Sequence, residues 1–173
     1  MKVARPTYEH PARDQYVVFA LQETRFAVPI LQVLRITRKL PLTHVPKAPD
    51  FLQGVINDHG VVVPVVDLRR RMALLGASQD EDAERIIIIE ASPTPEGAPQ
   101  VVGLLVDAVV GIDRIDDADI RPPPSMVAQV NGVYLTGVAR LEDQAVMVMD
   151  LDRVLTIDEV AQLSRRQDLD YAG

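Results

Sequence analysis

The chain has no cysteine and no tryptophan, and aromatic residues make up only 4% of its 173 residues. The lack of cysteine excludes disulfide bonds and thiolate metal sites. No apolar run approaches the ~18–20 residues that a membrane-spanning helix needs, and the N-terminal residues lack the apolar stretch of a signal peptide. Since 47% of the residues are hydrophobic, we expect a soluble cytoplasmic protein with its own core.

Basic charge is also scarce. The formal net charge is −7, which argues against binding to a nucleic-acid backbone, because such binding needs a basic surface. The one basic cluster is Arg69-Arg70-Arg71. We interpret it as the solvated face of a short helix that Asp67 caps and that ends near Gly76.

Short runs rich in β-branched residues indicate a chain made of strands. They lie at 16–21, 25–28, 34–40, 51–68, 85–90, 101–112, 133–141 and 145–149. Many of these runs are apolar on both faces, which predicts sheets that lie between two cores. We expect an all-β domain of two small barrels over residues 15–163. A flexible leader would precede it at 1–14, a capped C-terminal helix would lie near 156–163, and a polar tail would follow at 164–173.

The most informative segment is residues 51–68, FLQGVINDHGVVVPVVDL. Two apolar runs separated by Asn-Asp-His-Gly predict a tight hairpin. We expect a type I turn in which Asn57 holds the loop through its side chain and Gly60 takes a left-handed conformation. Asp58 and His59 would then face solvent at the tip. Pro64 would need an edge or bulged position, because proline cannot donate to a ladder.

Several blocks of sequence, in order, resemble the CheW family of bacterial chemotaxis adaptors. They are FAVPILQVLRI (26–36), the segment 51–71, VVGLLVDAVVGI (101–112), DDADIRPPP (116–124), VYLTGVARL (133–141) and VMVMDLDRVL (146–155). The resemblance implies two five-stranded barrels of the Src-homology-3-like type around a shared core. It also implies a non-enzymatic adaptor without cofactor. Such an adaptor links the regulatory domain of the histidine kinase CheA to the cytoplasmic tips of methyl-accepting chemoreceptors, and it is recruited to membrane-associated arrays.

Carried over by position, the resemblance marks ten residues for contact with other proteins. They are Ile30, Val33, Arg35, Gly54, Asn57, Asp58, His59 and Gly60, with Gly103 and Ile112 on the second barrel. Each has a structural alternative: the isoleucine and valine can pack in the core, and the glycines can serve backbone geometry. Arg35 alternates with apolar neighbours on its strand, which places it on the opposite face.

The chain departs from the family pattern at two of these places. Most members have Gln-Glu-Ile where this chain has Leu34-Arg35-Ile36, and Asn-Leu-Arg-Gly where it has 57–60. The family's glutamate and arginine form a pair across the first barrel. If the positions remain neighbours, Arg35 would meet Asp58 with the polarity reversed, and the partners should be altered to match.

Two other functions stay open. An enzyme would need more than the adjacent Asp58 and His59, because neighbours on a turn rarely point at one another and no nucleophile accompanies them. The histidines His10, His44 and His59 lack paired metal-ligand spacing, and the aspartates at 113–119 lack the glycine and glutamate of a calcium loop. A CheW-like variant that binds only one partner, or that serves a pilus or second-messenger pathway, is the other alternative.

Overall fold

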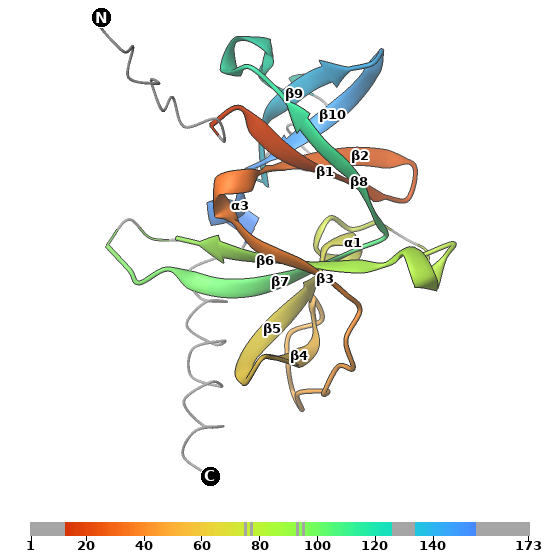
Figure 1. Cartoon of the computed structure of the whole chain (residues 1–173), viewed down its shortest axis with the longest axis vertical. Coiled ribbons are helices and arrows are strands. Elements are labelled where there is room, and N and C mark those ends of the chain that lie inside the picture. Colours follow the sequence, from red (N-terminus) through yellow and green to blue (C-terminus); the bar gives the residue numbers. More distant parts are fainter. Residues whose placement is uncertain are drawn as a thin grey trace, which may run out of the picture.

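The computed structural model describes residues 13–74, 76, 78–92, 94, 96–125 and 134–154. These residues form two five-stranded sheets stacked along the long axis of the molecule (Figure 1). Sheet A has the strand order β8-β1-β2-β10-β9, and sheet B has the order β3-β6-β7-β5-β4. The expected C-terminal helix at 156–163, the tail at 164–173 and all but the last two residues of the leader lie outside the described residues.

The strands match most of the predicted runs. Sheet A contains β1 (Gln15–Leu21), β2 (Thr24–Pro29), β8 (Ala108–Arg114), β9 (Leu135–Leu141) and β10 (Gln144–Met149). Sheet B contains β3 (Val33–Arg38), β4 (Leu52–Asp58), β5 (Val61–Asp67), β6 (Arg85–Ala91) and β7 (Gln100–Val106). Short helical turns connect them: η1 (Ile30–Gln32), α1 (Leu68–Arg71), η2 (Glu81–Ala83), η3 (Asp117–Asp119) and α3 (Leu151–Val154). The all-β prediction is confirmed.

Strands that are apolar on both faces divide their side chains between two cores. On β6, Ile87 and Ile89 join the large core that also holds residues of sheet A, whereas Ile86 and Ile88 join a separate core of sheet B. On β1, Val17 and Phe19 enter the large core and Val18 enters a separate core of sheet A. Each sheet therefore lies between a shared core and its own core, as the sequence predicts.

The two halves of the chain repeat one another. The hairpin β1–β2 joins sheet A while β3, β4 and β5 join sheet B; β6–β7 then joins sheet B while β8, β9 and β10 join sheet A. Both repeats contain a parallel pair, β5 with β7 and β10 with β2. In both repeats the last hairpin, β4–β5 or β9–β10, is followed by a short helix, and the aspartate before that helix, Asp67 or Asp150, accepts a hydrogen bond from the backbone N–H two residues on. The sequence has no fixed-period repeat, yet the fold is duplicated.

The repeat closes each sheet toward a barrel. A backbone bridge joins Thr43 to Val55 on β4, and the equivalent bridge joins Arg121 to Val138 on β9. A glycine makes room at each: a Cβ on Gly54 would lie 2.6 Å from the Thr43 carbonyl oxygen, and one on Gly137 would lie 2.5 Å from that of Arg121. Among the described residues neither sheet closes by a continuous ladder, so the two expected barrels are two curved sheets with single-bridge closures.

Two details differ from the sequence prediction. The run 101–112 forms two strands in different sheets, because the chain leaves sheet B at Asp107, whose backbone N–H donates to the Ala20 carbonyl of sheet A. β5 lies between β7 and β4, so Pro64 is not on an edge strand, but the β4–β5 pairing is irregular beside it, with a register shift between Leu52 and Gly54, near the bulge that the sequence predicts. The ladder with β7 begins at Val65, directly after the proline, so the missing N–H leaves that ladder intact.

Candidate functional site

The β4–β5 hairpin is tighter than predicted. Asp58 pairs with Val61 across the two strands, which leaves His59 and Gly60 as a two-residue turn. Both have positive φ, 52° and 88°, as a type I′ turn requires, so the type I prediction was wrong. Asn57 accepts a hydrogen bond from the Gly60 N–H at 2.8 Å through Oδ1, which confirms its turn-holding role.

Asp58 does not face solvent, which corrects the sequence prediction. Only 4% of the residue is exposed, because β4 continues through it and Asp58 shares the inner face with Ile56 in the core of sheet B. His59 does lie at the tip, with 79% of its side chain exposed. The turn therefore presents an imidazole outward and holds a carboxylate inward.

Arg35 forms an ion pair with the buried Asp58. The two residues come from β3 and β4, the opposite edge strands of sheet B, so the pair bridges the open side of that sheet. Arg35 lies opposite Ile88 and Ile36 lies opposite Ile87, which confirms that the arginine and its apolar neighbour are on opposite faces. The predicted contact between Arg35 and Asp58 is confirmed, and about half of the arginine side chain (46%) stays exposed.

In the second half of the chain, the positions equivalent to Arg35 and Asp58 carry no charge; they lie on β8 and β9, the edge strands of sheet A. The equivalent positions, counted from the bulges and glycines that the repeats share, are Gly111 on β8 and Leu141 on β9. Leu141 packs against the core of sheet A. Because the fold closes there with a glycine and a leucine, the Arg35–Asp58 pair is not a requirement of the architecture.

A second candidate surface is apolar and lies on the edge strands β3 and β8 and on η1, the helical turn before β3. Its members are exposed hydrophobic side chains: Leu31 (61%), Leu34 (51%), Ile36 (38%), Val110 (45%) and Ile112 (57%). Leu34 and Val110 are the extra residues at equivalent register shifts in the two strands. Edge bulges turn side chains outward. Of this set the sequence marked only Ile112; the alternation around the other four gave no sign of the bulges.

The remaining predicted residues divide by burial. Ile30 and Val33 are half-buried against the shared core, so they form the floor beside the exposed Leu31 and Leu34. Gly54 and Gly103 are buried. A Cβ on Gly103 would lie 2.9 Å from Ile86, so these two glycines permit close packing and present no surface to a partner.

The expectation that the arginine cluster is a solvated face holds for Arg70, whose side chain is 61% exposed, and is wrong for Arg69. Asp67 does cap α1, as predicted, but Arg69 is 9% exposed and its guanidinium lies 3.4 Å from Glu84 and 3.3 Å from Asp107. Glu84 also pairs with Lys39 at 2.9 Å. Arg71 lies over the Phe51 and Tyr134 rings. Arg69 and Arg71 are therefore structural, because their side chains contact segments from both sheets.

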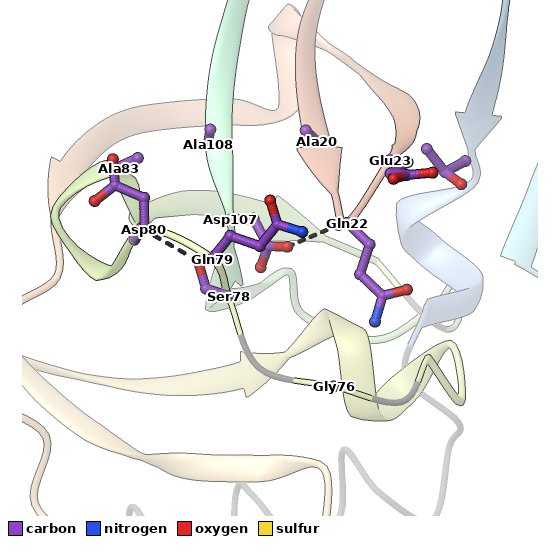
Figure 2. Close-up of a pocket in the computed structure, with 11 residues that line it drawn as sticks. Ala20, Gln22, Glu23, Gly76, Ser78, Gln79, Asp80, Ala83, Asp107 and Ala108 are labelled. Atoms are coloured by element: carbon purple, nitrogen blue, oxygen red, sulfur yellow. Dashed lines mark hydrogen bonds between the residues drawn. The ribbon is translucent and has the colours of Figure 1, made fainter.

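Beside this network lies a hollow of about 580 Å³ lined by Gln22, Ser78, Asp80 and Asp107, among others. Figure 2 shows Asp107 facing the β1–β2 turn, where it accepts a hydrogen bond from the Gln22 N–H at 2.7 Å. Within the described ranges no three His, Asp or Glu side chains are grouped to hold a metal ion. No helix in that part of the chain is long and apolar enough to cross a membrane.

The CheW-like domain model matches residues 15–159. A chemotaxis protein CheW from Klebsiella aerogenes is 31% identical over 148 residues, covering 86% of this chain and 85% of the relative. One from Rhizobium meliloti is 34% identical over 145 residues, covering 84% and 89%.

A solved structure agrees with this match. The crystal structure of the scaffolding protein TtCheW from Thermoanaerobacter tengcongensis superposes with a TM-score of 0.76 at 30% identity, covering 90% of this chain and 96% of that one. The family model, the two relatives and the two-sheet fold agree over nearly the same residues. The chain therefore belongs to the CheW-like domain family and is a homologue of chemotaxis scaffold proteins.

Proposed function

We propose that the chain is a non-enzymatic adaptor that couples methyl-accepting chemoreceptors to the histidine kinase CheA. It acts in the cytoplasm and is recruited to membrane-associated receptor arrays. The family match over residues 15–159 supports the scaffold role. The observation that carries the proposal is the Arg35–Asp58 pair at an exposed end of sheet B. The equivalent positions of the repeat hold Gly111 and Leu141, so the fold does not need an ion pair there, and contact with a partner is a reason for its presence.

The kinase site includes the β4–β5 turn and the facing part of β3. His59 and Arg35 are the polar groups that a partner meets there, since Asp58 is buried beneath them. Val61, 53% exposed, adds an apolar contact at the start of β5. Protein interfaces typically have apolar side chains at the centre and polar or charged side chains at the rim. Val61, with Arg35 and His59 beside it, has this composition. The regulatory domain of CheA is the partner we assign to this end.

The receptor site is the apolar surface on β3 and β8. An amphipathic helix binds by laying apolar residues into a hydrophobic groove, and the two edge strands supply exposed leucine, isoleucine and valine side chains for such contacts. Ile30 and Val33, half-buried against the shared core, form the base of this surface. The receptor tip is helical in the proteins that this family serves, so we assign it here.

Two exposed substitutions separate the sites. His59→Glu should weaken binding to the CheA regulatory domain and leave binding to a receptor-tip fragment unchanged, because its side chain lies only at the turn. Ile112→Glu should do the reverse. The CheA regulatory domain and the receptor-tip fragment are taken from the same organism as the chain, and binding is measured by co-elution and titration calorimetry. If both variants weaken both partners equally, the division into two sites is wrong; if the wild type binds neither partner, the adaptor function is wrong.

A second candidate is a CheW-like variant that binds one partner or serves a dedicated pathway, such as pilus motility or second-messenger control. The reversed polarity at Arg35 and Asp58 favours it, because like charges brought together across an interface cost several kcal/mol. A CheA whose interface complements the usual polarity would then bind this chain poorly. Co-elution with the receptor fragment alone, while CheA from the same organism stays unbound, would support this variant over the coupling adaptor.

A further inference from the structure

The apolar surface assigned to the receptor is built on the two segments that cross from one sheet to the other. β2 in sheet A leads through η1 to β3 in sheet B, and β7 in sheet B leads through Asp107 to β8 in sheet A (Figure 1). The exposed side chains of Leu31 and Leu34 belong to the first crossing, and those of Val110 and Ile112 belong to the second. The shape of the surface therefore depends on what holds each crossing in place.

The crossing from β7 to β8 is held by a buried arginine. Asp107, the residue between those strands, accepts a hydrogen bond from the Gln22 N–H at 2.7 Å and lies 3.3 Å from the guanidinium of Arg69. Arg69 belongs to α1 and is 9% exposed. The short helix that ends the first repeat therefore anchors the crossing of the second repeat.

The crossing from β2 to β3 has an equivalent anchor in Asp152. Asp152 is the second residue of α3, as Arg69 is the second residue of α1. Its Oδ1 accepts hydrogen bonds from the Gln32 side-chain amide of η1 at 3.2 Å and from the Ser92 N–H at 2.8 Å. Ser92 follows β6 as Gln22 follows β1, so the anchors match position by position. The carboxylate has moved from the crossing to the helix, and this anchor is exposed instead of buried.

Among the described residues, few other contacts fix η1. It has three residues, none of them buried, and one backbone hydrogen bond, from the Val33 N–H to the Ile30 carbonyl. Ile30 packs half-buried against the shared core, and the Gln32 amide also donates to the Glu90 carbonyl at 3.3 Å. Segments with few buried contacts open at a low cost in free energy. The hydrogen bond to Asp152 therefore contributes a large share of what holds this turn.

We propose that Asp152 is a positioning residue of the receptor site. It holds η1 through Gln32 and so fixes the direction in which Leu31 and Leu34 project. Leu34 lies at the register shift where β3 begins to pair with β6, two residues after Gln32, so a turn that moves at Gln32 moves both leucines. The inference rests on the receptor site proposed above. A surface that is formed only part of the time binds its partner with an affinity reduced by that fraction.

The test compares two changes of the same side chain. Asp152→Ala removes both hydrogen bonds, whereas Asp152→Asn keeps the Oδ1 that accepts them. Arg153→Ala is the matched control, since Arg153 is exposed on the same short helix and pairs with Asp150. Binding of the full chain to the receptor-tip fragment and to the CheA regulatory domain is measured by titration calorimetry. Amide hydrogen exchange over residues 30–36 reports how often η1 opens.

Asp152→Ala should bind the receptor-tip fragment about three- to tenfold more weakly, the range expected for the net loss of one or two hydrogen bonds. Its amides at 30–36 should exchange faster, while its affinity for the CheA regulatory domain stays at the wild-type value. Asp152→Asn and Arg153→Ala should stay within about twofold of the wild type for both partners. Gln32→Ala combined with Asp152→Ala should weaken receptor binding no more than either change alone, because both break the same contact.

The outcomes separate this inference from the function on which it rests. If the wild type does not bind the receptor-tip fragment, the receptor site is wrong and the inference falls with it. If the wild type binds and Asp152→Ala binds and exchanges like it, only the positioning role is wrong. An Asp152→Asn variant as weak as Asp152→Ala would mean that the charge contacts the receptor directly, and equal weakening of both partners would mean a general loss of structure; either would overturn the proposal.

Discussion

Removing Arg35 tests how far the buried carboxylate of Asp58 depends on its partner. In Arg35→Ala, the carboxylate of Asp58, which is 4% exposed in the wild type, loses the guanidinium. His59, with Nε2 at 4.0 Å and a largely exposed side chain, is a poor replacement. Breaking a fully buried ion pair costs about 3–5 kcal/mol. Because Arg35 is 46% exposed and water reaches the rim, we expect a loss of about 1–3 kcal/mol.

Asp58→Leu is the matched variant, since the equivalent position in the repeat is Leu141, which packs on the core of sheet A. Replacing the buried carboxylate by an apolar side chain should change stability by less than about 1 kcal/mol, because the remaining arginine can hydrate. The double variant Arg35→Ala/Asp58→Leu should then recover most of the loss seen in Arg35→Ala. The pair is thus expected to be strongly non-additive.

Urea unfolding of the four proteins measures this cycle. The slopes of free energy against urea should agree within error, so that shifts in midpoint report stability. A coupling of about 1–3 kcal/mol between the two positions supports the account. Additive losses, or an Asp58→Leu variant less stable than Arg35→Ala, would refute the claim that Arg35 chiefly neutralises a buried charge.

Three further predictions concern stability. Gly54→Ala should lower the free energy of unfolding by several kcal/mol and loosen the bridge to Thr43, since the φ of Gly54 is +153° and a Cβ would lie 2.6 Å from the Thr43 carbonyl oxygen. Gly111→Ala is the control: a Cβ there meets open space, so its stability in urea unfolding should stay within about 1 kcal/mol of the wild type. Arg69→Met should cost about 3–5 kcal/mol, because it removes the one guanidinium that lies between Asp67, Glu84 and Asp107, and a cost below about 1 kcal/mol would contradict this. Burial, with smaller contributions from the negative charges of Asp117 and Asp14, raises the pKa of the Tyr16 phenol. Because the folded-state pKa lies above the unfolded value, the stability that the neutral phenol contributes is complete below pH ~10 and is lost as pH rises through the folded-state pKa. Tyr16→Phe should therefore flatten the alkaline decline in melting temperature, and an unchanged decline would count against it.

The sequence predicts the strands well because the apolar runs are strong and their turns are marked. It also predicts the contact between Arg35 and Asp58, although only through resemblance, since nothing local to β3 places it against β4. The sequence does not predict the burial of Asp58, because Asn-Asp-His-Gly at 57–60 resembles a turn of four residues. The structure instead has a two-residue turn, and this moves Asp58 to the inner face.

Other features depend on contacts between segments far apart in the chain. The exposed surface of Leu34 and Val110 arises from bulges that exist only because β3 and β8 pair with β6 and β1. Arg69 is buried because Glu84 and Asp107 come from loops of other strands. The internal repeat leaves few matching residues, and the short motifs around Asp67 and Asp150 are its clearest trace in the sequence.

The adaptor account is tested most directly by asking whether the chain joins the two partners. Receptor-tip fragments are held on beads, CheA from the same organism is added, and the kinase retained is measured with and without the chain. We predict that CheA is retained only when the chain is present, and that either His59→Glu or Ile112→Glu reduces the amount retained. Equal retention without the chain, or none with it, would contradict the coupling function.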